Sequence, residues 1–203
     1  MIITKIEPQR NKKRVNIYID GEFAFGILKE IQYKYKLWEN TEIDRNYIED
    51  ILIAEQQAKA NDYALRFISY RQRSKKEIQD KLTKEGFDNK FIENTIAYLE
   101  SHRLIDDLEF AKSFARDKIN LNKYGPQKIK YELYKKGISD EIIDEVLDED
   151  DTEYTRALKL AKKKLPTYKK DDKNGKYRKL GGFLQRRGYS SDCVYKILKE
   201  LVK

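Results

Sequence analysis

Three stretches of the chain share one pattern of apolar residues around a glycine, and this repetition constrains the fold more than any other feature. The stretches read KEIQDKLTKEGF, QKIKYELYKKGI and RKLGGFLQRRGY, and their glycines, Gly86, Gly137 and Gly188, follow one another at intervals of 51 residues. Large aliphatic residues stand eight and four positions before each glycine: Ile78 and Leu82, Ile129 and Leu133, Leu180 and Leu184. Because residues four apart share one face of an α-helix, each stretch is predicted to be a helix with one buried face that ends at its glycine.

The residues around these turns predict two further helices in each repeat. After each glycine, an Asp or Ser that can cap a helix precedes a second apolar pattern, and Cys193 occupies a core position of that pattern. Ser74 and Glu77 form a capping box before the first glycine helix, and Pro126 suits the first turn of the second. Amphipathic segments at residues 62–71, 107–119 and 152–165 complete the repeats. We therefore expect a mainly α fold of three tandem three-helix repeats in an elongated, curved array.

The first sixty residues differ from the repeats and predict a small β-containing cap. Two alternating segments, residues 14–20 and 22–27, meet at an Asp-Gly pair, which is a strong signal for a β-hairpin. Residues 2–7 are a candidate third strand, and helical patterns then lead into the first repeat. The expected domains are residues 1–60, 61–105, 106–151 and 152–203, with a mobile loop at 166–176 in the third repeat.

Charge is distributed unevenly along the chain. The net charge of +8 divides into 0 for residues 1–60, −3 for residues 61–151 and +11 for residues 152–203. Such asymmetry indicates that one end of the molecule meets a polyanion. A solvated lysine face with no partner explains a charge run equally well, so the run alone does not decide between the two.

Cysteine content and the distribution of apolar residues predict the cellular location of the protein. The single cysteine cannot form an intramolecular disulfide, and the first residues, MIITKIEPQRNKK, lack the apolar core of a signal peptide. No run approaches the ~20 apolar residues that a membrane helix needs. We expect a soluble, cytoplasmic monomer with no membrane contact.

The sequence contains few residues or motifs that would support catalysis. There is one histidine, His102, and the sequence contains no nucleophile signature, metal-ligand cluster or phosphate-binding loop. The acidic clusters fit the first turns and exposed ends of helices, where they complement the helix dipole. We expect a protein that is not an enzyme and that uses no cofactor or metal.

The glycine helices carry basic residues at matched positions. Two positions before the glycines stand Lys84, Lys135 and Arg186, and nine positions before them stand Glu77, Lys128 and Lys179. These positions lie seven apart on one outward side of each helix, which is mixed in charge in the first repeat and basic in the other two. The candidate binding residues, here called the basic stripe, are Arg71, Arg73, Lys75, Lys84, Lys128, Lys130, Lys135, Lys136, Arg178, Lys179, Arg186 and Arg187. Solubility explains any one of them, but the repetition favours a binding surface.

The repeats, together with the segment SHRLIDDLEFAKSFARDK, resemble the RecX family of bacterial regulators of the RecA recombinase. The resemblance covers residues 60–203, and the stretches IDDLEFAKSFARDK and GPQKIKYELYKKGI are its most specific parts. It implies three tandem three-helix units that form a bent molecule lying in the groove of the RecA filament on DNA. The implied function, within DNA repair and the SOS response, is to restrain recombination and coprotease activity and to promote filament loss. The implied partners are the RecA filament and DNA. Single-stranded DNA is the main DNA partner implied, and double-stranded DNA is a further one.

Two other functions remain open from the residues alone. A helix, glycine turn and helix superficially resemble a helix-turn-helix, which would make the chain a DNA-binding transcriptional regulator. Such a protein usually concentrates base readout in one helix and dimerises, whereas this pattern occurs three times in one chain. The third reading is a scaffold of helical repeats that binds only proteins.

The repeat pattern generates a prediction about size in solution. Because each unit has its own helix pair and only neighbours share an interface, the radius of gyration should exceed that of a compact globule of the same length. A compact chain of this length would have a radius of gyration of about 16–17 Å. Small-angle X-ray scattering measures this quantity, and a value in that range would contradict the elongated array.

Overall fold

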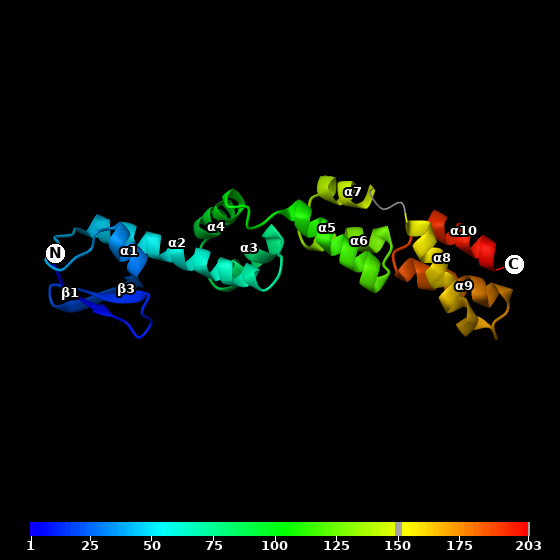
Figure 1. Cartoon of the computed structure of the whole chain (residues 1–203), viewed down its shortest axis with the longest axis horizontal. Helices are drawn as coiled ribbons and strands as arrows, with labels where there is room; N and C mark the ends of the chain where they lie inside the picture. The colour runs from blue at the N-terminus through cyan, green and yellow to red at the C-terminus, as the bar shows by residue number, and fades with distance from the viewer. Residues whose placement is uncertain (149–151, 203) are drawn as a thin grey trace. The chain divides into compact units, whose positions relative to one another are not determined.

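The computed structural model describes residues 1–148 and 152–202, and these residues are mainly helical. Ten α-helices follow a three-stranded sheet in the described ranges (Figure 1), which confirms the expected fold class. Within the same ranges, no helix combines the length and apolar character needed to cross a membrane. Contacts divide the chain into two compact units, the first made of residues 1–70 and 81–98 and the second of residues 71–80 and 99–203.

The N-terminal strands form one antiparallel sheet. Strands β1 (Ile3–Pro8), β2 (Arg14–Ile19) and β3 (Glu22–Leu28) pair in the order β1-β2-β3. Asp20 and Gly21 connect β2 to β3 with φ angles of 48° and 91°. Two successive positive φ angles are typical of the type I′ turn that suits the twist of a hairpin. The predicted hairpin and the third strand, which pairs with β2, are both confirmed.

A long helix closes the core of the first unit over this sheet. Helix α1 (Lys29–Lys34) is short, and α2 (Arg45–Ser69) continues for 25 residues, so the boundary expected between residues 60 and 61 lies inside a helix. Glu55 on α2 is only 2% exposed. Its carboxylate accepts a hydrogen bond of 2.8 Å from the backbone N–H of Leu28 and pairs with the Arg14 guanidinium at 2.7 Å. This buried pair fixes α2 to the sheet.

The last turns of α2 serve as the first helix of the first repeat. Helices α3 (Lys75–Lys84) and α4 (Asn89–Ser101) follow α2. Within the first unit, the side-chain amide of Gln57 donates to the Thr95 hydroxyl at 3.0 Å and to the carbonyl of Phe91 at 3.2 Å. Thr95 is fully buried, so these bonds satisfy polar groups that would otherwise be costly to bury.

The second unit contains the other two repeats, each with its own core. The second repeat comprises α5 (Asp107–Asp117), a π-helical turn η1 (Lys118–Asn122), α6 (Pro126–Lys135) and α7 (Asp140–Asp148). The third comprises α8 (Glu153–Lys164), a 3₁₀ turn η2 (Leu165–Tyr168), α9 (Lys173–Arg186) and α10 (Ser191–Leu201). The predicted aliphatic pairs of all three glycine helices are fully buried. Burial also raises the pKa of the Cys193 thiol to about 11, which fits a packing role for this residue.

The predicted helix ends are confirmed. Gly86, Gly137 and Gly188 have φ angles of 85°, 76° and 85°, the left-handed conformation that glycine adopts at no steric cost. The backbone N–H of Glu77 donates to the Ser74 hydroxyl at 3.2 Å, and the N–H of Ser74 donates back to the Glu77 carboxylate at 3.3 Å. These reciprocal bonds are the capping box.

The predicted mobile loop at residues 166–176 is wrong in extent. Residues up to Tyr168 belong to η2, and α9 already begins at Lys173. The Asp172 carboxylate accepts a hydrogen bond of 2.8 Å from the N–H of Gly175 and so caps the helix. A cap of this kind outweighs the weak helix propensity of the polar residues that follow, which the composition of the segment concealed.

The buried leucines of the glycine helices generate a stability prediction. Leu133→Asp should unfold the second repeat, because an unpaired carboxylate at a fully buried position costs several kcal/mol. Tyr134→Asp, on the same helix at a position that is 66% exposed, is the matched control and should change stability little. Urea unfolding followed by circular dichroism compares the two, and similar midpoints would contradict the predicted role of Leu133 in the core.

Candidate functional site

Neighbouring repeats in the second unit are joined where the start of one helix meets the glycine turn of the next repeat. At the start of α3, the Ser74 hydroxyl donates to the carbonyl of Lys136 at 2.7 Å. At the start of α6, the N–H of Gly125 donates to the carbonyl of Arg187 at 2.8 Å. Donors and acceptors in the two contacts are equivalent by the 51-residue repeat. We call the contact around Ser74 and Gly137 the first joint, and the contact around Gly125 and Gly188 the second joint.

Both joints require glycine for a second reason besides its φ angle. A Cβ atom on Gly137 would lie 2.6 Å from the Cβ of Lys76. A Cβ atom on Gly188 would overlap the backbone and Cβ of Lys128. The hydrogen bonds also satisfy carbonyl groups at a helix end, which have no partner inside their own helix. The joints are therefore tight contacts that fix the neighbouring side chains.

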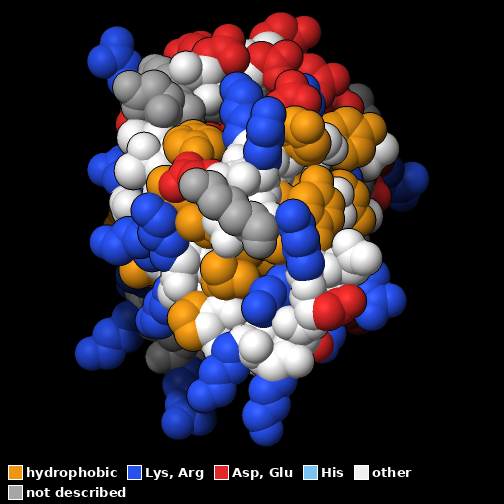
Figure 2. Space-filling view, turned by 90° about the vertical axis from the view of Figure 1, so that its right-hand side faces the viewer, with side chains coloured by type: hydrophobic (Ala, Val, Ile, Leu, Met, Phe, Trp, Pro, Cys, Tyr) orange, Lys and Arg blue, Asp and Glu red, His pale blue; other side chains and the backbone are white. Residues whose placement is uncertain are grey.

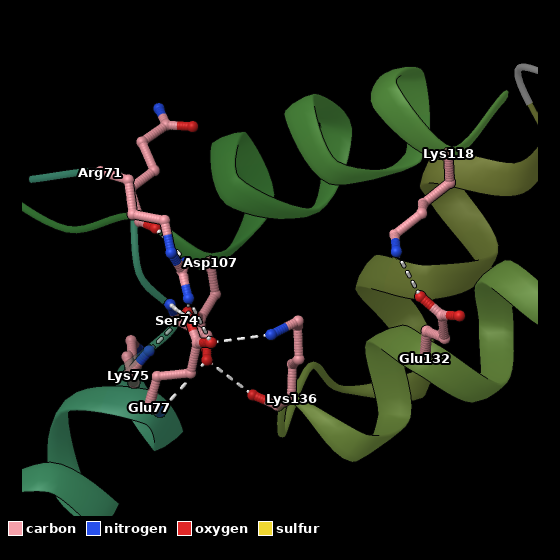
Figure 3. A network of polar contacts seen from close by, with 9 residues as sticks. Arg71, Ser74, Lys75, Glu77, Asp107, Lys118, Glu132 and Lys136 are labelled. Atoms are coloured by element: carbon pink, nitrogen blue, oxygen red, sulfur yellow. Dashed lines mark hydrogen bonds and ion pairs between the residues drawn. The ribbon is translucent and has the colours of Figure 1, made fainter. Parts of the chain in front are cut away.

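The first joint holds a network of charged side chains around Glu77 (Figure 3). One carboxylate oxygen of Glu77 accepts from the Lys136 ammonium at 2.7 Å and from the Arg71 guanidinium at 3.0 Å. The other oxygen accepts a second bond from Arg71 at 3.2 Å. Two members of the basic stripe, Arg71 and Lys136, thus share one carboxylate inside the joint.

This network shifts the titration of Glu77. Partial burial opposes ionisation of the carboxyl group and would raise its pKa, but the hydrogen bonds from Arg71 and Lys136 outweigh that effect and hold the pKa at about 2. The charged form is therefore the stabilised form. A folded-state pKa below the unfolded value means that this contribution is complete above about pH 4.5 and is lost as the pH falls toward 2.

Two more stripe residues lie beside this network. The backbone N–H of Lys75 donates to the Asp107 carboxylate at 2.9 Å, and its ammonium pairs with Glu100. Burial raises the pKa of Asp107 despite that hydrogen bond, whereas the bond to Glu100 raises the pKa of Lys75. Burial and the neighbouring Arg71 charge lower the pKa of Arg73, which is half-buried.

The second joint uses the equivalent acceptor carbonyl but has a different donor and a different set of charges. Lys128 stands where Glu77 stands in the first joint, and its ammonium lies 4.2 Å from the centre of the Tyr124 ring. The Arg187 guanidinium donates to the carbonyl of Asn122 and lies 5.5 Å from the centre of the Phe183 ring. Lys128, Arg186 and Arg187 line one cavity. The structure thus brings three stripe residues together here.

The other members of the basic stripe are dispersed. Lys130 pairs with Asp144 at 2.7 Å, Lys179 pairs with Asp171, and Lys135 lies 4.4 Å from the centre of the Tyr131 ring. The exposed stripe residues that form no ion pair with described residues are Lys84, Lys135, Arg178 and Arg186. Figure 2 shows Lys and Arg side chains gathered over the lower part of the face in view, with Asp and Glu at its top.

Sequence reasoning missed the segment that links α5 to α6. The helical segment expected at residues 107–119 covers only its first two residues, and η1 is a π-helical turn whose C-terminal cap, Lys123, has a left-handed φ of 55°. This turn brings Asn122 and Tyr124 to the second joint and leaves Leu121 77% exposed. The asparagines and the Gly-Pro pair in NLNKYGP were the signal for a helix end, although they do not specify a π-helical turn.

The described residues offer no assembled metal site, since no three His, Cys, Asp or Glu side chains in residues 1–148 and 152–202 form a cluster suited to an ion. His102 is exposed at the end of α4, where its ring contacts the Ser101 hydroxyl at 3.1 Å.

Comparison with known proteins gives matches along almost the whole chain. The family models match as follows: the regulatory protein RecX N-terminal domain at residues 1–44, and the first, second and third three-helix domains of RecX at 60–99, 106–147 and 151–198. The regulatory protein RecX of Clostridioides difficile is 39% identical over 99% of this chain and 96% of its own length. That of Clostridium tetani is 38% identical over 98% and 94%.

Solved structures agree with these matches. A crystal structure of regulatory protein RecX aligns with a TM-score of 0.82 and 35% identity over 98% of both chains. The crystal structure of RecX from Lactobacillus salivarius aligns with a TM-score of 0.68 and 33% identity, over 73% of this chain and 97% of its own.

The ion network of the first joint generates a prediction about pH. Glu77→Gln should lower the free energy of unfolding at pH 7 by about 1–2 kcal/mol, because it removes charge-assisted hydrogen bonds to two cations. The difference from wild type should shrink as the pH falls from about 4.5 toward 2, because the wild-type carboxylate is then protonated. Urea unfolding at pH 7, 5 and 3 measures both effects.

The matched control is Glu85→Gln, which removes an exposed ion pair with Lys81 and should cost much less. Equal losses for the two variants at pH 7, or a difference for Glu77→Gln that is as large at pH 3 as at pH 7, would contradict the role of Glu77.

Proposed function

The chain belongs to the RecX family of regulatory proteins, and on that premise we propose that it regulates a RecA recombinase by binding the RecA filament on DNA. The family is one of regulators and not of enzymes, so this function requires no catalytic group. Matches to successive parts of the chain from residue 1 to residue 198 support the proposal for the chain as a whole.

The proposed regulation is mainly inhibitory. Bound in the groove of the filament, the protein restrains strand exchange and coprotease activity and promotes loss of the filament. Tandem repeats suit such a target, because units joined in series present binding groups in series to a partner that is itself repetitive. In this proposal the basic residues contact DNA phosphates, and other surfaces of the repeats contact RecA.

The observation that carries the DNA part of the proposal is basic charge that the protein itself does not neutralise. Residues 152–203 have a net charge of +11. At the second joint, Lys128 and Arg187 contact aromatic rings and a backbone carbonyl, and no carboxylate pairs with them among the described residues. Unneutralised cations gathered on one part of a protein favour a polyanionic partner.

A helix-turn-helix regulator is less well supported by the second repeat. The helix after the glycine turn would have to enter the major groove of DNA. In the second repeat this helix is α7, which reads DEIIDEVLD and carries no Lys or Arg. Phosphates would repel it, so sequence readout by this helix is disfavoured.

The proposal predicts the effect of removing four stripe residues. Replacing Lys128, Lys135, Lys179 and Arg186 with Gln should weaken binding to single-stranded DNA and to RecA filaments. The slope of log affinity against log salt should fall by up to ~0.7 for each phosphate of a single strand that the variant no longer neutralises. Thermal stability should change little, because exposed charges contribute little to folding. Binding at several salt concentrations, with DNA-dependent ATP hydrolysis by the cognate RecA, measures the outcome.

A control variant replaces four exposed lysines outside the stripe, Lys12, Lys13, Lys34 and Lys90, and loses the same charge. It should bind almost as wild type does. Equal effects of the two variants would place the contact elsewhere, first at the lysine-rich segment from Lys162 to Lys173. Failure of the wild-type protein to alter RecA ATP hydrolysis at stoichiometric amounts would overturn the proposed function itself.

A further inference from the structure

A cavity of about 450 Å³ opens beside the second joint. Its walls include the cations Lys128, Arg186 and Arg187, the ring of Tyr124 and the exposed side chain of Leu121, and they include no carboxylate. Proteins usually pair the charges that they remove from water, so a concave surface with three cations and no acid is unusual. We therefore expect this cavity to bind an anion.

The cavity beside the first joint also has cations in its walls, and it shows how they are neutralised. A cavity of about 460 Å³ lies beside it, with Arg71, Lys118 and Lys136 in its walls. Each of these cations has a carboxylate partner in the protein: Glu77 binds Arg71 and Lys136, and Glu132 binds Lys118 at 2.8 Å. The first cavity is thus internally neutralised.

The 51-residue repeat relates the charged residues of the two joints, although most of the residues that line the two cavities do not correspond. Lys136 corresponds to Arg187, so the cation is retained, whereas the acid Glu77 corresponds to the base Lys128. The acceptor carbonyl is equivalent in both places, although the donor is the Ser74 hydroxyl in the first joint and the Gly125 N–H in the second. The exchange of Glu77 for Lys128 has therefore removed the carboxylate that the retained cation would bind and has added a cation, while Arg71 of the first joint corresponds to Asn122.

We propose that the cavity at the second joint binds a backbone phosphate of single-stranded DNA, with Lys128, Arg186 and Arg187 as its ligands. The phosphate supplies the negative charge that the Glu77 carboxylate supplies in the first joint. This inference rests on the proposed function, which it deepens by assigning one DNA contact to one site.

The site is held in position before any ligand binds. The Arg187 guanidinium is held by the carbonyl of Asn122 and the ring of Phe183. The backbone of Lys128 is packed against Gly188, and its ammonium lies over Tyr124. Cations that are already ordered lose less conformational entropy on binding, and guanidinium groups match the geometry of phosphate oxygens.

The apolar wall favours a nucleotide over a bare anion. Leu121 is 77% exposed, which packing does not explain, and it lies with Tyr124 on the same cavity wall as the cations. Single-stranded nucleic acids bind where a basic groove adjoins apolar and aromatic side chains that receive sugars and bases. The cavity combines both features.

The test is Lys128→Glu, which gives the second joint the acid that the first joint carries. Because the new carboxylate can pair with Arg187 as Glu77 pairs with Lys136, the melting temperature should be unchanged or higher. The affinity for a short oligo(dT) strand should fall about tenfold or more, in keeping with the removal of charge-assisted hydrogen bonds to phosphate. Lys128→Met, which removes the charge without adding an acid, should weaken binding in the same direction.

The matched control is Lys196→Glu, which makes the same change of charge at an exposed position on α10. It should reduce affinity by less than about threefold, as expected of a distant charge that salt screens. Inorganic tripolyphosphate, compared with chloride at equal ionic strength, tests whether the cavity takes free phosphate. Competition with oligo(dT) by tripolyphosphate for wild type, and its absence for Lys128→Glu, would support the site.

The remaining outcomes each overturn part of the proposal. Equal affinities of the wild type, Lys128→Glu and Lys196→Glu for oligo(dT) would refute the site. The proposed function would still stand. A wild-type protein with no affinity for oligo(dT) at low salt would refute the DNA contact altogether. Loss of RecA filament binding in Lys128→Glu with unchanged oligo(dT) binding would show that an acidic protein surface, and not DNA, occupies the cavity.

Discussion

Hydrogen bonds between the start of one helix and the carbonyl groups of a glycine turn hold the repeats of the second unit in series. Such a bond satisfies a carbonyl group at the end of a helix, which has no partner within its own helix. Ser74 supplies the donor in one joint with its hydroxyl, and Gly125 does so in the other with its backbone. The joint therefore depends on backbone geometry and tolerates different side chains around it.

Glycine is required at the repeat turns for two different reasons: a left-handed φ angle and, at some turns, the lack of space for a Cβ atom. At Gly86, a Cβ atom would meet nothing within 4 Å among the described residues, so only the left-handed φ requires glycine there. At Gly137 and Gly188 the close approach of a lysine adds a steric demand. The sequence predicted the first demand, because turn chemistry is local. It did not predict the second, because the two sides of a joint lie about sixty residues apart along the chain.

The same distinction separates what was predictable at the candidate site from what was not. Matched positions on the glycine helices identified the basic residues, and helical phase placed Lys84, Lys135 and Arg186 on exposed positions. The residues that pair with these basic side chains across a joint could not be predicted from helical phase. The pairing of Glu77 with Lys136 joins two repeats, and the π-helical turn that brings Asn122 to Arg187 has no clear sequence signal. Long-range pairing decided which basic residues are neutralised.

Joints whose acceptor is a backbone carbonyl allow charge to diverge without loss of the fold. The exchange of Glu77 for Lys128 between equivalent positions leaves the hydrogen bonds to Lys136 and Arg187 intact. In the first joint the acid closes an ion network, which stabilises the contact between two repeats. In the second joint the base leaves cations without a carboxylate, and aromatic rings hold them instead. Stability and ligand binding are thus separated between two copies of one structural element, and a change in one copy need not disturb the other.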